Sequence, residues 1–239
     1  MRHLDHQGVG TTPGICTTPL LHLVTDPRLP RAQLLAVIRA AAENGADWIQ
    51  VRDHQASARE LFDLAQAVVT ICRPRGVWVA VNDRIDVALA VGVDGVQLGG
   101  RSLPVGVARE LVGALSLGVS VHTIESAVQV EAEGVDWVTF GHVFPTSSHP
   151  DTTPRGVAAL AQAVQAVHTP VIAIGGIGTQ HVGPVIQAGA AGIAVMSAIL
   201  DALDSARATA ELRQALDNVT VKAGSIGPCH HARRLAPME

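Results

Sequence analysis

Eight short runs rich in Val, Ile and Leu alternate along this chain with eight longer segments of helical periodicity. Runs of this length are typical of buried strands, and the longer segments repeat apolar residues at the spacing of one helix face. The predicted strands cover residues 21–25, 48–52, 78–82, 95–98, 118–122, 137–144, 171–175 and 192–197. The predicted helices cover residues 30–44, 57–73, 85–91, 104–112, 124–133, 156–167, 179–188 and 205–221.

This alternation constrains how the strands can pair. Strands joined through helices run parallel, because each return to the sheet needs a crossover of a dozen or more residues. Closure of eight such units is the simplest solution, so the pattern predicts a TIM (β/α)8 barrel of the α/β class. An open doubly wound sheet is the alternative, but no Gly-x-Gly-x-x-Gly sequence follows the first predicted strand.

The two ends of the chain lack this periodicity. Residues 1–19 are rich in His, Gly, Thr and Pro, and residues 222–239 have no apolar repeat. We therefore expect flexible tails at 1–19 and 222–239 around a barrel at 20–221. His230 and His231 could bind a metal in the second tail, but a tail without a ligand is the simpler interpretation.

Composition narrows the class of protein. With 48% hydrophobic and 16% charged residues, the chain can bury a large core. A net charge of -4 without a basic run or zinc-finger spacing disfavours nucleic acid as a partner. No apolar run reaches the roughly 20 residues of a membrane span. Cys16, Cys72 and Cys229 lie far apart, which favours a reduced, cytoplasmic setting over a disulfide framework.

Polar residues gather where the predicted strands end, and the active site of a barrel forms at that rim. The candidates for substrate binding are Arg52, Asn82, Arg84, Gln97, His142 and Phe144, with His122 as a proton shuttle. Each has a structural alternative: an ion pair of Arg84 with Asp53, Asp83 or Asp86, and a core or carbonyl-binding role for the histidines.

The last two predicted strands carry a phosphate-binding pattern. Gly175 and Gly176 would leave backbone amides bare, and Met196 and Ser197 can start a short helix whose amides point the same way. Barrels often hold a phosphate between these two loops. Tight turns alone would also explain the glycines.

Two further features bear on a candidate magnesium site and on the loop after the sixth predicted strand. Asp53, Asp83 and Asp94 raise the question of a magnesium site, but residues 99–102 read Gly-Gly-Arg-Ser and supply no second carboxylate. We therefore expect no metal and no cofactor. The hydroxyl- and proline-rich segment 145–155 is either a lid over the substrate or a floppy loop.

The rim motifs, taken in order, resemble the thiamine phosphate synthase superfamily over residues 20–203. The similar segments are Leu-Val-Thr-Asp at 23–26, Asn-Asp-Arg-Ile-Asp at 82–86, Gly-Val-Gln-Leu-Gly at 95–99, Phe-Gly-His-Val-Phe-Pro-Thr at 140–146, Ala-Ile-Gly-Gly-Ile at 173–177 and Ala-Val-Met-Ser-Ala-Ile at 194–199. One branch, the synthases, joins a pyrimidine pyrophosphate to a thiazole phosphate with magnesium.

The chain departs from the synthase pattern at three places. Synthases usually read Gln-Leu-Arg-x-Lys in the second strand, where residues 50–54 are Gln-Val-Arg-Asp-His. They carry a Gln-Asp or Glu-Asp pair after the fourth strand, which is missing here. Their sixth strand reads Gly-Pro-Val-Phe-Pro-Thr-x-Thr-Lys, where residues 141–149 are Gly-His-Val-Phe-Pro-Thr-Ser-Ser-His. Loss of two cations and a metal ligand should weaken a pyrophosphate site.

The other branch, the TenI-like thiazole tautomerases, is similar at the fifth and sixth strands. Residues 120–127 read Ser-Val-His-Thr-Ile-Glu-Ser-Ala and residues 140–144 read Phe-Gly-His-Val-Phe. This resemblance implies an isomerase of thiamine biosynthesis, which shifts one proton to aromatise a carboxylated thiazole phosphate without a metal. It places the catalytic acid and base at His122.

The sequence thus favours a thiazole tautomerase and leaves two alternatives open. These are a thiamine phosphate synthase with an altered magnesium and pyrophosphate site, and a non-catalytic protein that binds a thiazole phosphate. In each case the partner is a small phosphorylated thiazole, with no nucleic acid or membrane, and with homo-oligomers possible.

Overall fold

The computed structural model describes residues 14–15, 18–148, 150–219 and 228–229. Eight parallel strands close into a barrel in the order β2-β3-β4-β5-β6-β7-β8-β9, and β9 pairs back with β2. The barrel strands are β2 (Leu20–Val24), β3 (Trp48–Val51), β4 (Trp78–Asn82), β5 (Gly95–Leu98), β6 (Ser116–Val121), β7 (Trp137–Gly141), β8 (Val171–Ile174) and β9 (Gly192–Val195). The predicted TIM-like α/β fold is confirmed, and the open sheet is excluded.

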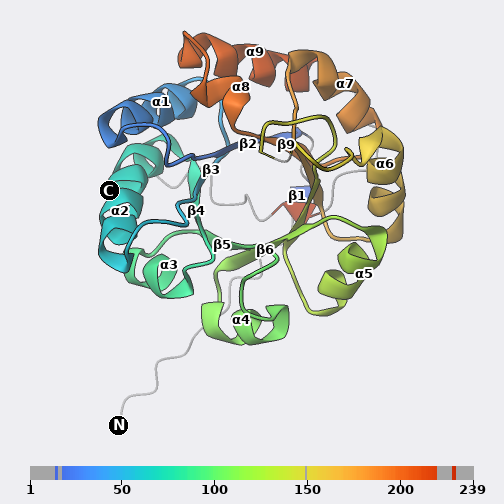
Figure 1. Ribbon diagram of the computed structural model, residues 1–239, viewed down its shortest axis with the longest axis horizontal. Helices are drawn as coiled ribbons and strands as arrows, with labels where there is room; N and C mark the ends of the chain where they lie inside the picture. Colours follow the sequence, from blue (N-terminus) through green and yellow to red (C-terminus); the bar gives the residue numbers. More distant parts are fainter. Residues whose placement is uncertain (1–13, 16–17, 149, 220–227, 230–239) are drawn as a thin grey trace.

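The helices form a ring outside the strands (Figure 1). They are α1 (Arg31–Glu43), α2 (Ala58–Cys72), α3 (Ile85–Val91), α4 (Val105–Val112), α5 (Ile124–Ala132), α6 (Gly156–Ala166), α7 (Thr179–Gln187), α8 (Ser197–Leu200) and α9 (Ser205–Asp217), with a 3-10 turn η1 (Arg73–Arg75). Ser57 begins α2 with a capping box, in which its side chain accepts from the backbone of Glu60 while the Glu60 carboxylate accepts from the backbone of Ser57.

Two predicted strands end earlier than their apolar residues suggested. The sequence predicted a strand to residue 144, but β7 ends at Gly141, and buried Val143 packs in the core beyond the strand. Residue 197 was predicted as strand, but β9 ends at Val195 and Ser197 opens α8. Hydrophobicity continues past a strand wherever the rim loop is itself packed, so it does not define the strand end.

A short antiparallel pair joins segments that were predicted as tails. β1 (Gly14–Ile15) pairs with β10 (Pro228–Cys229). Most of residues 1–19 and 222–239, with His230 and His231, lies outside the described residues, so the division into barrel and tails stays a prediction. In the part of the chain that the structure describes, no helix is long and apolar enough to cross a membrane.

Aromatic residues fill the barrel interior at the N-terminal ends of its strands. The rings of Trp78 and Trp137 lie 5.2 and 5.3 Å from the ring of Trp48. Gly118 on β6 leaves room for Trp137, because a Cβ at residue 118 would overlap the indole ring. Small residues in β5 and β6 therefore allow a barrel of aliphatic strands to hold three indoles.

We expect Gly118→Ala to lower the free energy of unfolding by about 1–3 kcal/mol, the usual cost of overpacking a core. Gly106→Ala is the matched control, because a Cβ at residue 106 meets no atom within 4 Å and Ala favours the helix. Urea denaturation of both variants measures the difference. Equal stability of the two variants would contradict the packing described here.

Burial determines the chemistry of the cysteine on α2. Cys72 is a free, buried thiol on α2, and burial raises its pKa to about 12. Cys72 is therefore neither a nucleophile at neutral pH nor part of a disulfide.

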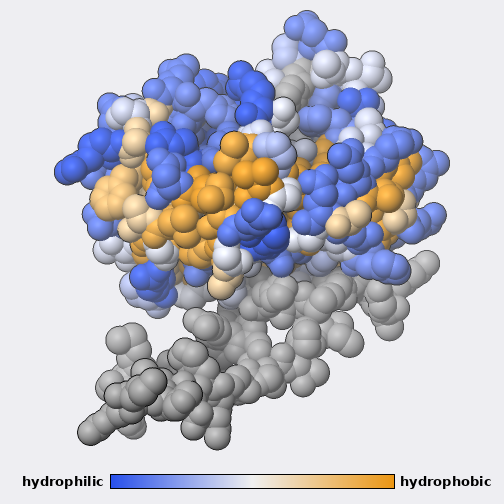
Figure 2. Space-filling view, turned by 90° about the horizontal axis from the view of Figure 1, so that it is seen from below, coloured by the Kyte–Doolittle hydropathy of each residue, from blue (hydrophilic) through white to orange (hydrophobic). Residues whose placement is uncertain are grey.

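Hydrophobic side chains are also exposed on the outside of the barrel. Figure 2, seen from the side on which α4 lies, shows a hydrophobic patch on this face. The large apolar residues exposed on α3, α4, α5 and the loop before α4 are Leu89, Leu103, Val107, Leu111 and Val128.

Candidate active site

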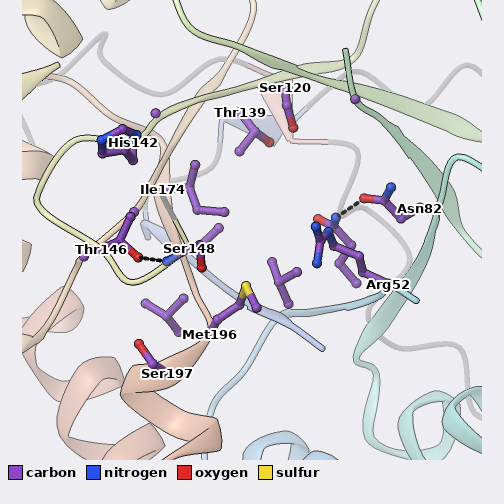
Figure 3. A pocket seen from close by; sticks show the side chains of 18 of the residues that line it. Arg52, Asn82, Ser120, Thr139, His142, Thr146, Ser148, Ile174, Met196 and Ser197 are labelled. Carbon is purple, nitrogen blue, oxygen red and sulfur yellow. Dashed lines mark hydrogen bonds between the residues drawn. The ribbon is translucent and has the colours of Figure 1, made fainter. Parts of the chain in front are cut away.

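A cavity of about 420 Å³ opens at the C-terminal ends of the strands (Figure 3). Its walls come from the loops after almost every barrel strand, as expected for this architecture. The polar and glycine residues that line it are Arg28, Gln50, Arg52, His54, Asn82, Asp83, Gly99, Gly100, Arg101, Ser120, His122, Thr139, Gly141, His142, Thr146, Ser147, Ser148, Gly175, Gly176 and Ser197, with Met196 beside them.

Most residues predicted for the site meet in this cavity. Those that line it are Arg52, Asn82, His122, His142, Gly175, Gly176, Met196 and Ser197. Arg84, Gln97 and Phe144 do not line it, so substrate contacts are not supported for these three.

Each of these three residues has a partner elsewhere. Arg84 donates to both carboxylate oxygens of Asp86, at 2.9 and 2.6 Å, which is the ion pair considered as its alternative. Gln97 is buried in the barrel, where its Oε1 accepts from the indole N–H of Trp137 at 2.8 Å. Phe144 stacks on His181 with ring centroids 4.0 Å apart. The sequence placed these residues near strand ends but could not give their depth or direction.

The cavity also contains two basic side chains that the sequence analysis did not assign to the substrate. Arg101 and His54 both line it, and His54 Nδ1 lies 3.5 Å from an Asp83 carboxylate oxygen. Burial and the guanidinium of Arg52 lower the pKa of His54, and Arg101 acts in the same direction. Both residues follow predicted strands, so their position after the second and fourth strands was the available signal.

Of the three arginines that line the cavity, Arg52 and Arg101 differ from Arg28 in their pairing. Arg28 is held by Asp26, with a shortest contact of 2.7 Å. Among the described residues, neither Arg52 nor Arg101 forms an ion pair. Figure 3 shows Arg52 reaching toward the middle of the cavity, opposite His142 and Ser197. Two guanidinium groups are therefore available to an anionic ligand.

Asp83 is the one acidic residue lining the cavity in the part of the chain that the structure describes. Its backbone has a φ of 61°, a left-handed conformation that Asp tolerates better than most residues. Its Oδ2 accepts from Asn82 Nδ2 at 2.7 Å, and its Oδ1 accepts from the Ser102 hydroxyl and from the backbone of Gly99. The carboxylate thus ties the β5–α4 loop to the end of β4.

These residues do not fit a magnesium ion held by the protein. Magnesium binds through one or two carboxylates in an octahedral oxygen shell. Both oxygens of Asp83 already accept hydrogen bonds from the protein, and its surroundings are cationic. Within the described ranges, Asp83 is the one carboxylate that lines the cavity, and no group of three or more His, Cys, Asp or Glu side chains gathers that could hold a metal ion.

The opposite wall is formed by the turns after β8 and β9, of which the first packs tightly against the chain after β7. Gly175 and Gly176 have φ values of 101° and 66°, and a Cβ at either would overlap the chain after β7. Close packing against His142 and Pro145 therefore requires both glycines, in agreement with the tight-turn interpretation. Their role toward a phosphate stays a prediction.

The two histidines hold parts of the site in place. His122 Nδ1–H donates to the Gly141 carbonyl at 2.6 Å. His142 is buried and its Nε2–H donates to the Thr152 carbonyl at 3.2 Å, while the Arg155 N–H donates to the His142 carbonyl at 2.9 Å. His142 thereby fixes the β7–α6 loop, whose hydroxyl residues line the cavity. Motion of this loop as a lid stays a prediction.

Comparison with known proteins identifies relatives along the whole barrel. The model of the family described as thiamine monophosphate synthase matches residues 21–199. The thiamine-phosphate synthase of Pyrococcus abyssi is 41% identical over 199 residues, which are 83% of this chain and 95% of that protein. The thiamine-phosphate synthase of Chloroflexus aurantiacus is 43% identical over 202 residues, 84% of this chain and 93% of that protein.

Solved structures agree. Thiamine phosphate pyrophosphorylase from Pyrococcus furiosus is 39% identical, with a TM-score of 0.78 over 84% of this chain and 96% of that one. A 3-hexulose-6-phosphate synthase, 22% identical with a TM-score of 0.69 over 82% of this chain and 99% of that one, shares the fold.

The predicted isomerase activity, and with it the assignment to the tautomerase branch, is wrong, because relatives with about 40% identity over most of the chain are thiamine-phosphate synthases. The histidine motifs that suggested a tautomerase have structural partners here, since His122 holds the Gly141 carbonyl and His142 holds the β7–α6 loop. The match over residues 21–199 and the identity to these synthases show that the chain belongs to the thiamine monophosphate synthase family.

Proposed function

We propose that this chain is a transferase that forms thiamine phosphate from a pyrimidine pyrophosphate and a thiazole phosphate. The observation that carries the proposal is that one cavity has two walls suited to anions. Arg52 and Arg101 line one wall, and the turns at Gly176 and Ser197 form the other. A protein that joins two phosphorylated molecules must hold both anionic groups in one site, with their reacting atoms close together.

The proposed assignment of the walls follows from charge. A pyrophosphate carries more negative charge than a phosphate monoester, so it belongs with the two guanidinium groups. The thiazole phosphate belongs with the backbone amides near Gly176 and Ser197, where the first N–H groups of α8 have no partner within the helix. The hydroxyls of Thr146 and Ser148 face the space between these walls (Figure 3).

The reaction breaks one bond and forms one bond. The carbon–oxygen bond between the pyrimidine side chain and pyrophosphate breaks, and its electron pair leaves on the pyrophosphate. A lone pair of the thiazole ring nitrogen forms the new carbon–nitrogen bond, so the ring gains one positive charge and the pyrophosphate one negative charge. No acid or base is required, so we assign His122 a positioning role through its hydrogen bond to Gly141.

The proposal is tested by measuring pyrophosphate release with each substrate alone and with both together. Release only in the presence of both substrates is the expected result. Binding of the thiazole phosphate without any release would favour a non-catalytic binding protein instead.

The phosphate wall gives a separate prediction. Gly176→Ala should weaken thiazole phosphate binding about 10-fold or more, because the Cβ would push against Phe144 and Pro145 and displace the turn. Calorimetric titration measures the dissociation constant. Gly183→Ala, where a Cβ meets no atom within 4 Å, is the control and should bind normally. An unchanged dissociation constant in Gly176→Ala would move the phosphate elsewhere.

The remaining expectations belong to the same proposal. A cytoplasmic location, the absence of a nucleic-acid partner and a homo-oligomer stay predictions. Light scattering of the purified protein would give the oligomeric state.

A further inference from the structure

We propose that the guanidinium groups of Arg101 and Arg52, and no protein-held magnesium ion, balance the charge of the departing pyrophosphate. This inference rests on the synthase activity proposed above. It starts from the β5–α4 loop, where Arg101 lines the cavity and Ser102 contacts Asp83.

The protein uses the Asp83 carboxylate to hold neighbouring chain segments together. Ser102 and the backbone of Gly99 donate to one carboxylate oxygen, and Asn82 donates to the other. The Asn82 side chain is itself fixed, since its Oδ1 accepts from Gln50 Nε2 at 2.7 Å. Asp83 would be the single carboxylate that this part of the cavity offers a metal, and its oxygens are shared with these hydrogen bonds. The carboxylate therefore serves to hold the loop that carries Arg101.

The balance of charge around the cavity favours an anion over a divalent cation. Asp83 is its one acidic residue among those described, while Arg28, Arg52 and Arg101 are permanently charged. Because Asp26 pairs with Arg28, two guanidinium charges face a single carboxylate. A divalent cation placed there would be repelled, whereas a pyrophosphate would be attracted.

Arg52 and Arg101 both act on the part of the cavity around His54. Both guanidinium groups influence His54, which contacts Asp83 between the ends of β3 and β4. Arg52 lies directly after β3, and Arg101, in the loop that Asp83 holds, is exposed and lines the same cavity. A guanidinium binds a phosphoryl group through two parallel hydrogen bonds, so two arginines suit the two phosphoryl groups of pyrophosphate.

The chemistry needs this charge when the carbon–oxygen bond breaks. The electron pair of that bond stays on the leaving oxygen, and pyrophosphate gains one negative charge while the thiazole ring gains a positive one. Donors fixed where negative charge develops lower the barrier, and the loss of one such donor typically costs about 10²–10³-fold in rate.

The test measures pyrophosphate binding and turnover in EDTA and in magnesium. Inorganic pyrophosphate is titrated into the wild type, Arg101→Ala and Arg84→Ala by calorimetry, and the turnover of both substrates is measured under the same conditions. Arg84→Ala is the matched control, because it removes the same charge from a rim arginine that is paired with Asp86 outside the cavity. Thermal melts check that each variant is folded.

We expect the wild type to bind pyrophosphate and to turn over in EDTA, with each reduced at least 10-fold in Arg101→Ala and unchanged in Arg84→Ala. Turnover that requires magnesium and is unaffected in Arg101→Ala would overturn the inference and leave the synthase proposal intact. Arg101-dependent pyrophosphate binding in EDTA without turnover would support this binding site but remove the synthase activity. If the wild type showed neither pyrophosphate binding nor turnover, in EDTA or in magnesium, both proposals would be overturned.

A variant designed to gain a magnesium site tests the absence of a protein-held metal without an activity measurement. Ser102→Asp would place a second carboxylate against Asp83, and the two should repel unless a cation lies between them. Magnesium should then raise the melting temperature of Ser102→Asp by several degrees, but not that of the wild type or of Ser102→Asn. A magnesium-dependent rise in the wild type would overturn the inference.

Discussion

Arg52→Ala is expected to lower kcat/KM for the pyrimidine pyrophosphate by about 10²–10³-fold, the usual cost of removing one fixed donor from a developing negative charge. Arg52 follows β3 directly, its guanidinium points into the cavity, and it forms no ion pair with the described residues. Steady-state kinetics with the second substrate at saturation measures the effect.

The conservative variant separates charge from geometry. Arg52→Lys keeps the positive charge but loses the planar pair of donors, so it should recover only part of the lost kcat/KM. Arg59→Ala removes an equally charged but exposed residue of α2, paired with Asp63, and should leave kcat/KM unchanged. If Arg52→Ala were as active as Arg59→Ala, the guanidinium would not contact the substrate.

Arg213→Ala is expected to lower the free energy of unfolding by about 2–4 kcal/mol. Arg213 on α9 donates to Asp47 at 3.1 Å and to the Pro19 carbonyl at 3.0 Å, and its side chain is 16% exposed. Asp47 also accepts from the backbone of Leu21 at 2.9 Å, so Arg213 links the last helix to the first strand of the barrel. Its removal leaves a half-buried carboxylate without its cation, which is costly.

Denaturant unfolding of Arg207→Ala gives the control for this prediction. Arg207 lies on the same helix, is 77% exposed and pairs with Glu211, so its loss should cost less than about 1 kcal/mol. A similar loss of stability in the two variants would mean that the link between α9 and the start of the barrel contributes little.

The fold could be predicted from the sequence because its elements repeat a clear pattern. Buried strands appear as apolar runs, and the helices between them repeat one apolar face. The ends of β7 and β9 could not be predicted, since Val143 continues the apolar run after the chain has left the strand. The pairing of Gly14 with Cys229 also lacks any local signal, because two residues in each strand show no periodicity.

The site could be predicted in part, because the end of a strand indicates the rim of the barrel but not the direction of a side chain. Arg52 and His142 reach the cavity, whereas Gln97 bonds to Trp137 and Arg84 turns to Asp86. The function was misjudged because His122 stands where an acid–base residue could act, whereas relatives with about 40% identity are thiamine-phosphate synthases. The sequence alone also does not show that His122 Nδ1 bonds to the Gly141 carbonyl.

The most direct test of the account is a phosphorus NMR measurement on the purified chain with a pyrimidine pyrophosphate and a thiazole phosphate. The account predicts that the signals of the two substrates decay together, while one thiamine phosphate and one pyrophosphate appear for each pair consumed. Substrate signals that persist unchanged with a folded protein, or a pyrophosphate signal that grows without thiamine phosphate, would contradict it.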